Sequence, residues 1–179
     1  MSKRREETLL SDEETRKMIG ELARAIAADI THPEKRVIVG IRRGGAILAE
    51  ILCEQLKDIF GSAFPMGFLD ITFYRDDLKT VGPNPVVGAT DLTMDIDDKR
   101  IILVDDVLFT GRTIRAALNA LFDYGRPEIV DLMVLMDRGH RQLPIQPDYL
   151  GRAVETGNQD TIKLLRGADS RLSVVRRYL

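Results

Sequence analysis

At the centre of the 179-residue chain the sequence reads Arg100-Ile101-Ile102-Leu103-Val104-Asp105-Asp106-Val107-Leu108-Phe109-Thr110-Gly111-Arg112-Thr113. The apolar, β-branched run before the two aspartates predicts a strand buried on both faces, as in a parallel sheet. We expect this strand to stop at the aspartates and a loop to follow from Val107 to Gly111. A helix is predicted from about Arg112 to Tyr124, because Gly125-Arg126-Pro127 supplies the glycine and proline that end helices.

The same alternation of strands and helices extends to both sides of this unit. A helix is predicted from Ser11 to about Asp29, because Ser11 and Glu14 have the spacing of a capping box. Helical spacing of apolar residues predicts one more helix from Ala46 to about Lys57. Apolar runs predict further strands at Arg36–Ile41, Phe64–Phe73, Val86-Val87, Leu92–Ile96 and Glu128–Met136. This order predicts a single α/β domain over residues 1–179, with a mainly parallel central sheet flanked by helices.

Composition excludes several classes of protein. With 44% hydrophobic and 30% charged residues, the chain is neither disordered nor fibrous. A single cysteine, Cys53, excludes a disulfide scaffold and a multi-thiolate metal site, and the two histidines argue against a His-rich zinc site. No apolar run is long enough for a membrane span or a signal peptide, so we expect a cytoplasmic protein without membrane contact. The net charge of -2 argues against unspecific nucleic-acid binding.

The loop after the central strand has the features of a phosphate site. In open α/β sheets, ligands bind beyond the carboxyl ends of the strands. A loop that enters a helix presents unpaired N–H groups and the positive end of the helix dipole. Gly111 allows close approach of the backbone, and Thr110 and Thr113 add hydroxyl donors. The spacing matches neither a Walker loop nor a GxGxxG dinucleotide loop.

Asp105 and Asp106 suit the hydroxyls of a sugar or a metal ion. Neighbouring strand residues point to opposite faces, so both carboxylates reach one ligand only if the chain has left the strand by Asp106. The alternative is that one aspartate simply caps the following turn. The phosphate-type loop that follows favours the ligand-binding interpretation.

These residues resemble a known family. Ile101–Thr113 resembles the phosphoribosyl pyrophosphate (PRPP) motif of type I phosphoribosyltransferases. Asp70–Leu78 and Asp137–Ile145 resemble the PyrR family of bifunctional pyrimidine operon regulators and uracil phosphoribosyltransferases, and the likeness runs from the first helix to about residue 166. The resemblance implies a type I phosphoribosyltransferase-like fold with a flexible loop and a small hood at about 138–160. It also implies a Mg2+-dependent enzyme that converts uracil and PRPP to UMP and pyrophosphate.

The resemblance also implies roles for particular residues. Asp105 and Asp106 would act in catalysis by binding the ribose hydroxyls and would contact Mg2+, which is held mainly through PRPP. Arg75, with Tyr74 and Asp76, falls on the flexible loop that would close over the reacting centre and exclude water. The other implied PRPP contacts are Arg42, Arg43, Gly44, Val107, Leu108, Phe109, Thr110, Gly111, Arg112 and Thr113. Taken alone, the arginine loop also fits a solvated basic turn, and the flexible loop fits a surface hairpin without chemistry.

Base recognition is implied for Arg138, Gly139 and Ile162, which would contact uracil or UMP. His140 receives no catalytic role, because a single histidine in a polar turn is more often structural. Purine-type relatives of the motif carry an acidic residue at the position of Phe109, so the aromatic residue favours a pyrimidine base. A phosphoribosyltransferase for orotate or a purine remains the alternative enzyme.

A second class of function is a UMP-responsive regulator that binds the mRNA leader of a pyrimidine operon to promote transcription attenuation, with little catalysis. The cations available for RNA are Arg16, Arg24, Arg141 and Arg152. The chain departs from RNA-binding members at Val154–Asp160, which contains no cation, and at Gly20 and Glu21. The near-neutral charge therefore places the enzyme ahead of the regulator. Family members associate, so we expect a homodimer or a larger assembly.

Overall fold

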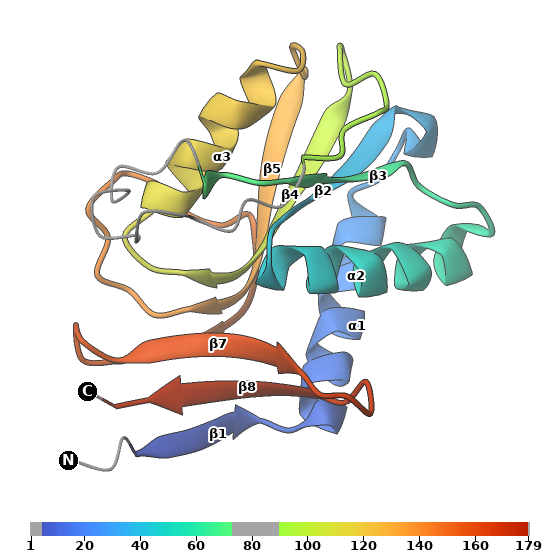
Figure 1. The fold of residues 1–179 in the computed structure, drawn as a ribbon. Coiled ribbons are helices and arrows are strands. Elements are labelled where there is room, and N and C mark those ends of the chain that lie inside the picture. Colours follow the sequence, from blue (N-terminus) through green and yellow to red (C-terminus); the bar gives the residue numbers. More distant parts are fainter. Residues whose placement is uncertain (1–4, 73–89, 179) are drawn as a thin grey trace.

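The computed structural model describes residues 5–72 and 90–178, which form two β-sheets and the helices that cover them (Figure 1). The larger sheet is parallel and five-stranded, in the order β3-β2-β4-β5-β6. Its strands are β2 (Arg36–Ile41), β3 (Met66–Leu69), β4 (Arg100–Leu108), β5 (Ile129–Asp137) and β6 (Tyr149–Ala153). The predicted α/β class with a mainly parallel sheet is confirmed.

A smaller antiparallel sheet lies below the carboxyl ends of the parallel strands in Figure 1. It joins both ends of the chain in the order β1-β8-β7, with β1 at Glu6–Leu10, β7 at Thr161–Arg166 and β8 at Leu172–Arg177. Glu6 lies opposite Arg177, so this pairing closes nearly the whole length of the chain. The sequence pattern did not predict this sheet.

Three α-helices cover the parallel sheet: α1 (Asp12–Ala28), α2 (Gly44–Phe60) and α3 (Arg112–Phe122). A short 3-10 helix, Pro33–Lys35, leads into β2. The predicted capping box is present, since Ser11 accepts the Glu14 N–H and the Glu14 carboxylate accepts the Ser11 N–H. Helix α1 ends at the cap residue Asp29, as expected.

The two faces of the parallel sheet have separate apolar cores. Helices α1 and α2 share one core with the small sheet, and its buried residues include Ile26, Leu52, Ile102, Leu164 and Val174. Helix α3 covers the other face, where Ile101, Leu103, Ile114, Leu121 and Val134 are buried. The continuously apolar runs of β2 and β4 follow from this arrangement, because both faces of these strands are covered.

Some element boundaries differ from the prediction. The central strand does not stop at the aspartates but continues through them to Leu108, where pairing with β5 persists. No strand forms in the described residues near 92–96; Asp91 alone makes an isolated bridge to Phe68. Val86-Val87 lies outside the described residues. Residues 138–160, expected as a hood, include β6, which belongs to the parallel sheet.

Polar groups at the amino ends of the parallel strands form a closed network. The Asp131 carboxylate accepts hydrogen bonds from Arg36 at 3.1 Å and from Arg100 at 2.6 and 3.0 Å. Arg36 also donates to the Asp29 carbonyl, and the Tyr149 hydroxyl donates to the Asp29 carboxylate. Burial and the neighbouring Asp29 raise the pKa of Tyr149 to about 12, so this hydroxyl keeps its proton. The network ties β2, β4, β5 and β6 to the end of α1.

Candidate active site

The amino terminus of α2 touches the carboxyl end of β4, and two glycines permit this approach. A Cβ atom on Gly44 would lie 2.2 Å from the Asp106 carboxyl carbon. A Cβ atom on Gly45 would lie 2.2 Å from the Val104 carbonyl oxygen. Such distances are far inside van der Waals contact, so only glycine fits at either position. Gly44 is among the predicted PRPP contacts, and the adjacent Gly45, which was not predicted, is the further sequence signal for this close packing.

Asp106 lies between α2 and the small sheet. Its Oδ2 atom accepts the backbone N–H of Leu164 at 3.2 Å, so the carboxylate joins β4 to β7. Burial raises the pKa of Asp106 above its ordinary value, although the backbone N–H of Leu164 acts in the opposite direction. Burial therefore disfavours the charged form of the Asp106 carboxyl group, and pKa shifts of this kind are common at ligand-binding sites.

Asp105 lies on the other side of the strand. It is buried, and its Oδ1 atom accepts the Asp106 N–H at 3.0 Å. In the parallel register Asp105 is opposite Val134, which belongs to the core under α3. The Asp105 side chain nevertheless turns back to the Asp106 carboxylate and is hydrogen-bonded to it, so the two carboxyl groups meet at the end of β4 although the strand continues past them.

The loop between β4 and α3 is held in place by the chain after β5. The Thr110 carbonyl accepts the N–H groups of Gln142 and Leu143 at 3.0 and 3.1 Å. Gly111 has a φ of 90°, a left-handed conformation that disfavours any residue with a side chain. The Thr110 hydroxyl accepts the Arg112 N–H at 3.3 Å at the start of the helix. The predicted phosphate loop, Val107–Thr113, thus leads directly into a helix N-terminus.

The two helices at this edge begin differently from α1. Neither α2 nor α3 has a side-chain cap at its N-cap residue, and neither has an acidic residue in its first turn. Helix α1 has the Ser11 capping box and three acidic residues there. The starts of α2 and α3 are therefore suited to an anion supplied from outside the chain.

The basic residues of the β2–α2 loop are exposed at the same edge. Arg42 and Arg43 are exposed and are joined by a cis peptide bond. The Arg42 N–H donates to the Leu69 carbonyl at 2.9 Å, which fixes the loop beside β3. The Arg42 guanidinium lies 5.1 Å from the centroid of the Phe68 ring. The loop is thus a supported part of the structure, and its cations lie next to the start of α2.

Arg138 follows β5 and is buried, with only 5% of its surface exposed. Its guanidinium carbon lies 3.9 Å from the centroid of the Phe109 ring, so the two predicted ligand regions stack on each other. Gly139 has a φ of 72°, and His140 Nε2–H donates a 2.7 Å hydrogen bond to the Thr156 carbonyl. The Ile162 side chain is buried in the core of the α1–α2 face.

The candidate RNA contacts are not gathered at this edge. Arg16 pairs with Asp12 at 3.0 Å on the same helix, while Arg24 and Arg152 are exposed on α1 and β6. Arg141 donates to the carbonyls of Phe109 and Ile145 and pairs with Asp137, so it supports the phosphate loop from inside the protein. Arg75, with its neighbours Tyr74 and Asp76, lies outside the described residues.

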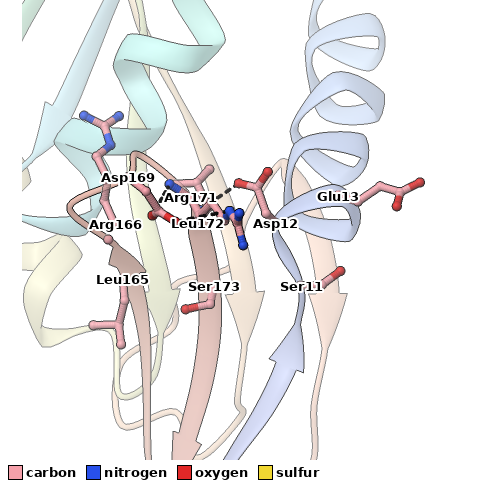
Figure 2. Close-up of a pocket in the computed structure, with 10 residues that line it drawn as sticks. Ser11, Asp12, Glu13, Leu165, Arg166, Asp169, Arg171, Leu172 and Ser173 are labelled. Atoms are coloured by element: carbon pink, nitrogen blue, oxygen red, sulfur yellow. Dashed lines mark hydrogen bonds and ion pairs between the residues drawn. The ribbon is translucent and has the colours of Figure 1, made fainter.

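A groove of about 800 Å³ lies elsewhere, between the β7–β8 turn and the start of α1 (Figure 2). Ser11, Asp12, Arg166, Asp169, Arg171 and Leu172 are among the residues that line it. Its charges are largely engaged, since Asp169 pairs with Arg171 and Asp12 accepts the Leu172 N–H. Asp105 and Asp106 do not line this groove, so it is separate from the candidate active site.

Within residues 5–72 and 90–178, no group of three or more His, Cys, Asp or Glu side chains is placed to hold a metal ion. Cys53 is also an unsuitable ligand or nucleophile, because burial raises the pKa of its thiol to about 12. No helix in the described part of the chain is both long and apolar enough to cross a membrane.

Comparison with known proteins agrees with this arrangement. The family model of the phosphoribosyl transferase domain matches residues 7–162. The chain belongs to the phosphoribosyltransferase family. Within it, the chain is 46% identical to the bifunctional protein PyrR of Nostoc punctiforme over 167 residues, which is 93% of each protein. It is 52% identical to PyrR of Pelotomaculum thermopropionicum over 128 residues, 72% of this chain and 71% of the relative. It therefore belongs to the PyrR proteins of that family.

Solved structures of the family show the same fold at lower identity. A hypoxanthine-guanine phosphoribosyltransferase of Bacillus anthracis is 21% identical and superposes with a TM-score of 0.67, over 89% of this chain and 88% of that one. A hypoxanthine phosphoribosyltransferase of Staphylococcus aureus is 22% identical, with a TM-score of 0.66 over 84% and 79% of the chains. These structures support the type I phosphoribosyltransferase-like fold.

Proposed function

We propose that this protein is a uracil phosphoribosyltransferase, which converts uracil and PRPP to UMP and pyrophosphate. One observation carries the proposal. A pair of adjacent carboxylates, Asp105 and Asp106, lies between two helix N-termini that have no acidic residue in their first turns and no side-chain cap. PRPP has the matching pattern, because its ribose hydroxyls lie between a phosphate at one end and a pyrophosphate at the other.

Helices α2 and α3 cover different faces of the parallel sheet, which agrees with this pattern. The 5′-phosphate fits the Thr110–Thr113 loop at the start of α3. The pyrophosphate fits Arg42, Arg43 and the start of α2, on the side of Asp106. A ribose that spans the two sites passes the end of β4, where each carboxylate accepts a hydrogen bond from a hydroxyl.

A Mg2+ ion fits the same donors. Mg2+ prefers oxygen ligands, keeps several waters and is commonly bound by one or two carboxylates together with substrate phosphates. Asp105 and Asp106 with the oxygens of PRPP supply such a set, whereas the described side chains alone supply no cluster of three ligands. When bound, the ion neutralises negative charge that builds up on pyrophosphate.

The reaction replaces a sugar–oxygen bond with a sugar–nitrogen bond. The bond from the anomeric carbon to pyrophosphate breaks, the ring nitrogen of uracil forms the new bond, and the uracil proton leaves to solvent. The arginines stabilise the departing anion, and the fixed ribose holds the electron-poor carbon in line with the base. Arg75 would act on the flexible loop, where closure removes competing water.

Base selection is assigned to the region where Arg138 stacks on Phe109. Arg138, Gly139 and Ile162 are proposed to recognise uracil or UMP. An aromatic residue at Phe109 cannot accept a hydrogen bond from a purine ring nitrogen, which supports a pyrimidine. The decisive experiment incubates the protein with PRPP, Mg2+ and one base at a time. UMP should form with uracil, whereas exclusive formation of another nucleotide would reject the assignment.

RNA-dependent regulation is a second proposal, favoured by the identity of 46% to a bifunctional PyrR protein over 93% of the chain. Its support from the residues is limited to exposed cations such as Arg24 and Arg152. A UMP-enhanced, salt-dependent mobility shift of a pyrimidine-operon leader hairpin would support it, and no binding at low salt would reject it. We further propose that the protein is cytoplasmic and forms a homodimer or a larger assembly. Light scattering of the purified protein tests the assembly.

A further inference from the structure

The turn Thr156–Asn158, which follows β6, is held by charged side chains at both backbone polar groups of Gly157. The Gly157 N–H donates to Asp160 Oδ2 at 2.8 Å. The Gly157 carbonyl accepts a hydrogen bond from Arg138 Nη2 at 2.8 Å. The turn therefore has little freedom to move while both charged side chains remain in place.

Arg138 connects this turn to the phosphate loop. Besides Gly157, it donates to the Thr156 hydroxyl at 3.1 Å and to the Asn158 carbonyl at 3.2 Å. Its guanidinium plane stacks on Phe109, which precedes the start of α3. The hydrogen-bonding capacity of Nε and Nη2 is thus directed to the turn. A shift of the turn would move Arg138 and with it the contact to Phe109.

Asp160 connects the same turn to the small sheet. Its Oδ2 atom accepts hydrogen bonds from Arg176 Nε at 3.1 Å and Nη2 at 2.6 Å. Asp160 is 7% exposed, so the pair is shielded from solvent. The Arg176 hydrogen bonds keep the pKa of Asp160 below its ordinary value, and the carboxylate stays ionised near neutrality. Arg176 is itself opposite Ile162 in the β7–β8 register and lies over the Tyr178 ring.

We propose that the Asp160–Arg176 pair is a positioning device for the base subsite: it holds the Thr156–Asn158 turn against Arg138 and so sets the place of the groups that receive uracil. This inference rests on the proposed function and adds residues that do not touch the substrate. Asp160 and Arg138 hold the same turn, and Arg176 is opposite Ile162 in the β7–β8 register, whereas the proposed pyrophosphate contacts Arg42 and Arg43 lie in the β2–α2 loop. Removal of the pair should therefore affect uracil more than PRPP.

The kinetic test compares Asp160→Ala with the wild type. A small misplacement of a substrate-positioning group costs up to about 100-fold. We expect KM for uracil to rise about 10- to 100-fold, while KM for PRPP and kcat change less than about threefold. Asp160→Asn keeps an acceptor for the Gly157 N–H but loses the charge opposite Arg176. Its KM for uracil should therefore lie between those of the wild type and Asp160→Ala. Equal changes of both KM values, or no change in either, would overturn the proposal.

Arg176→Ala should reproduce the selective change, and the double variant with Asp160→Ala should be no worse than the more affected single variant, because the two side chains act as one unit. Glu50→Gln is the matched control. It breaks the more exposed Arg166–Glu50 pair, 2.9 Å, which ties the end of β7 to α2. Its KM for uracil should remain that of the wild type, and a rise equal to that of Asp160→Ala would count against a specific role.

Two further readouts separate this proposal from the assignment of the substrate. UMP binding by calorimetry should weaken in Asp160→Ala by the same factor as KM for uracil. Hydrogen exchange of the Thr156–Asn158 amides should accelerate in that variant but not in Glu50→Gln. If the wild type forms no UMP, the substrate assignment fails, while accelerated exchange still supports the positioning role. Unchanged exchange in a folded Asp160→Ala protein would reject it.

Discussion

The two ends of the parallel sheet treat charge in opposite ways. At the amino ends of the strands, the Asp131 carboxylate is matched by Arg36 and Arg100 within 3.1 Å, and the surrounding polar groups are hydrogen-bonded to one another. At the carboxyl ends, Asp105 and Asp106 lie next to each other with the glycines of α2 packed against them, and Arg42 and Arg43 are exposed. The charges at the amino ends hold the fold together, whereas those at the carboxyl ends are placed where the proposed ligand binds.

The difference between the ends predicts that changes at the amino end affect stability and leave the chemistry intact. Asp131→Ala leaves Arg36, whose side chain is 4% exposed, without its carboxylate. Removing one partner of a buried pair costs about 3–5 kcal/mol. We expect urea denaturation to show a loss of that size, with kcat of the folded protein within about twofold of the wild type.

Asp169→Ala is the control for this prediction. Asp169 pairs with Arg171 at 3.1 Å, and the two side chains are 58% and 78% exposed. Exposed pairs contribute at most about 1 kcal/mol, so this variant should unfold nearly as the wild type does. A similar loss in both variants would show that the amino-end network has no special role in stability.

Asp106→Asn tests the carboxyl end in the opposite sense. The amide preserves the shape of the side chain and an acceptor for the Leu164 N–H, but it removes the charge. Loss of one preorganised group that acts on the reacting substrate typically lowers turnover about 100- to 1,000-fold. We expect such a fall in kcat, with a melting temperature equal to or above that of the wild type, because the buried charge is gone. Wild-type kinetics would remove Asp106 from the site.

Gly44→Ala tests the contact between α2 and β4. The added methyl group would lie 2.2 Å from the Asp106 carboxyl carbon, so the helix start or the carboxylate must move. Overpacking of this kind costs about 1–3 kcal/mol. We expect a matching fall in the free energy of unfolding and a rise in KM for PRPP. Gly20→Ala is the matched control, because Gly20 lies within helix α1 and the nearest atom to its added Cβ would be 3.7 Å away.

The elements that sequence patterns predicted are those with local signals. The run Ile101–Val104, the Thr110-Gly111 loop and the Ser11–Glu14 capping box each lie within a few residues, and the structure confirms the strand, the loop before α3 and the cap. The small sheet depends on pairs such as Glu6 and Arg177, which a local pattern cannot reveal. The alternation Ile162-Lys163-Leu164 is a signal for β7 that was available in the sequence.

The candidate site was predictable to a different extent. Asp105, Asp106 and Gly44 come from short motifs, and the structure places Gly44 against Asp106. The strand was expected to end before Asp106, but its pairing with β5 continues because α2 and α3 cover both faces of β4. The Leu164 N–H and the Asp160–Arg176 pair come from the small sheet, so they could not be found before that sheet was known.

The pH dependence is the smallest of the expected effects and the one that separates binding from stability most directly. Burial raises the pKa of Asp106, so the folded protein holds this proton more tightly than the unfolded chain does. The contribution of Asp106 to stability is then greatest below the unfolded pKa of about 3.9 and is lost as pH rises through the folded pKa.

Activity that needs the carboxylate changes the other way, so kcat/KM should fall on acidification at a pH above the ordinary range of aspartate. The test measures kcat/KM and the free energy of unfolding against pH for the wild type and for Asp106→Asn. The wild type should show the acid fall in kcat/KM and the loss of stability with rising pH, and Asp106→Asn should show neither. If the acid limb of kcat/KM persists in Asp106→Asn, another group controls it and the raised pKa of Asp106 has no part in the pH profile.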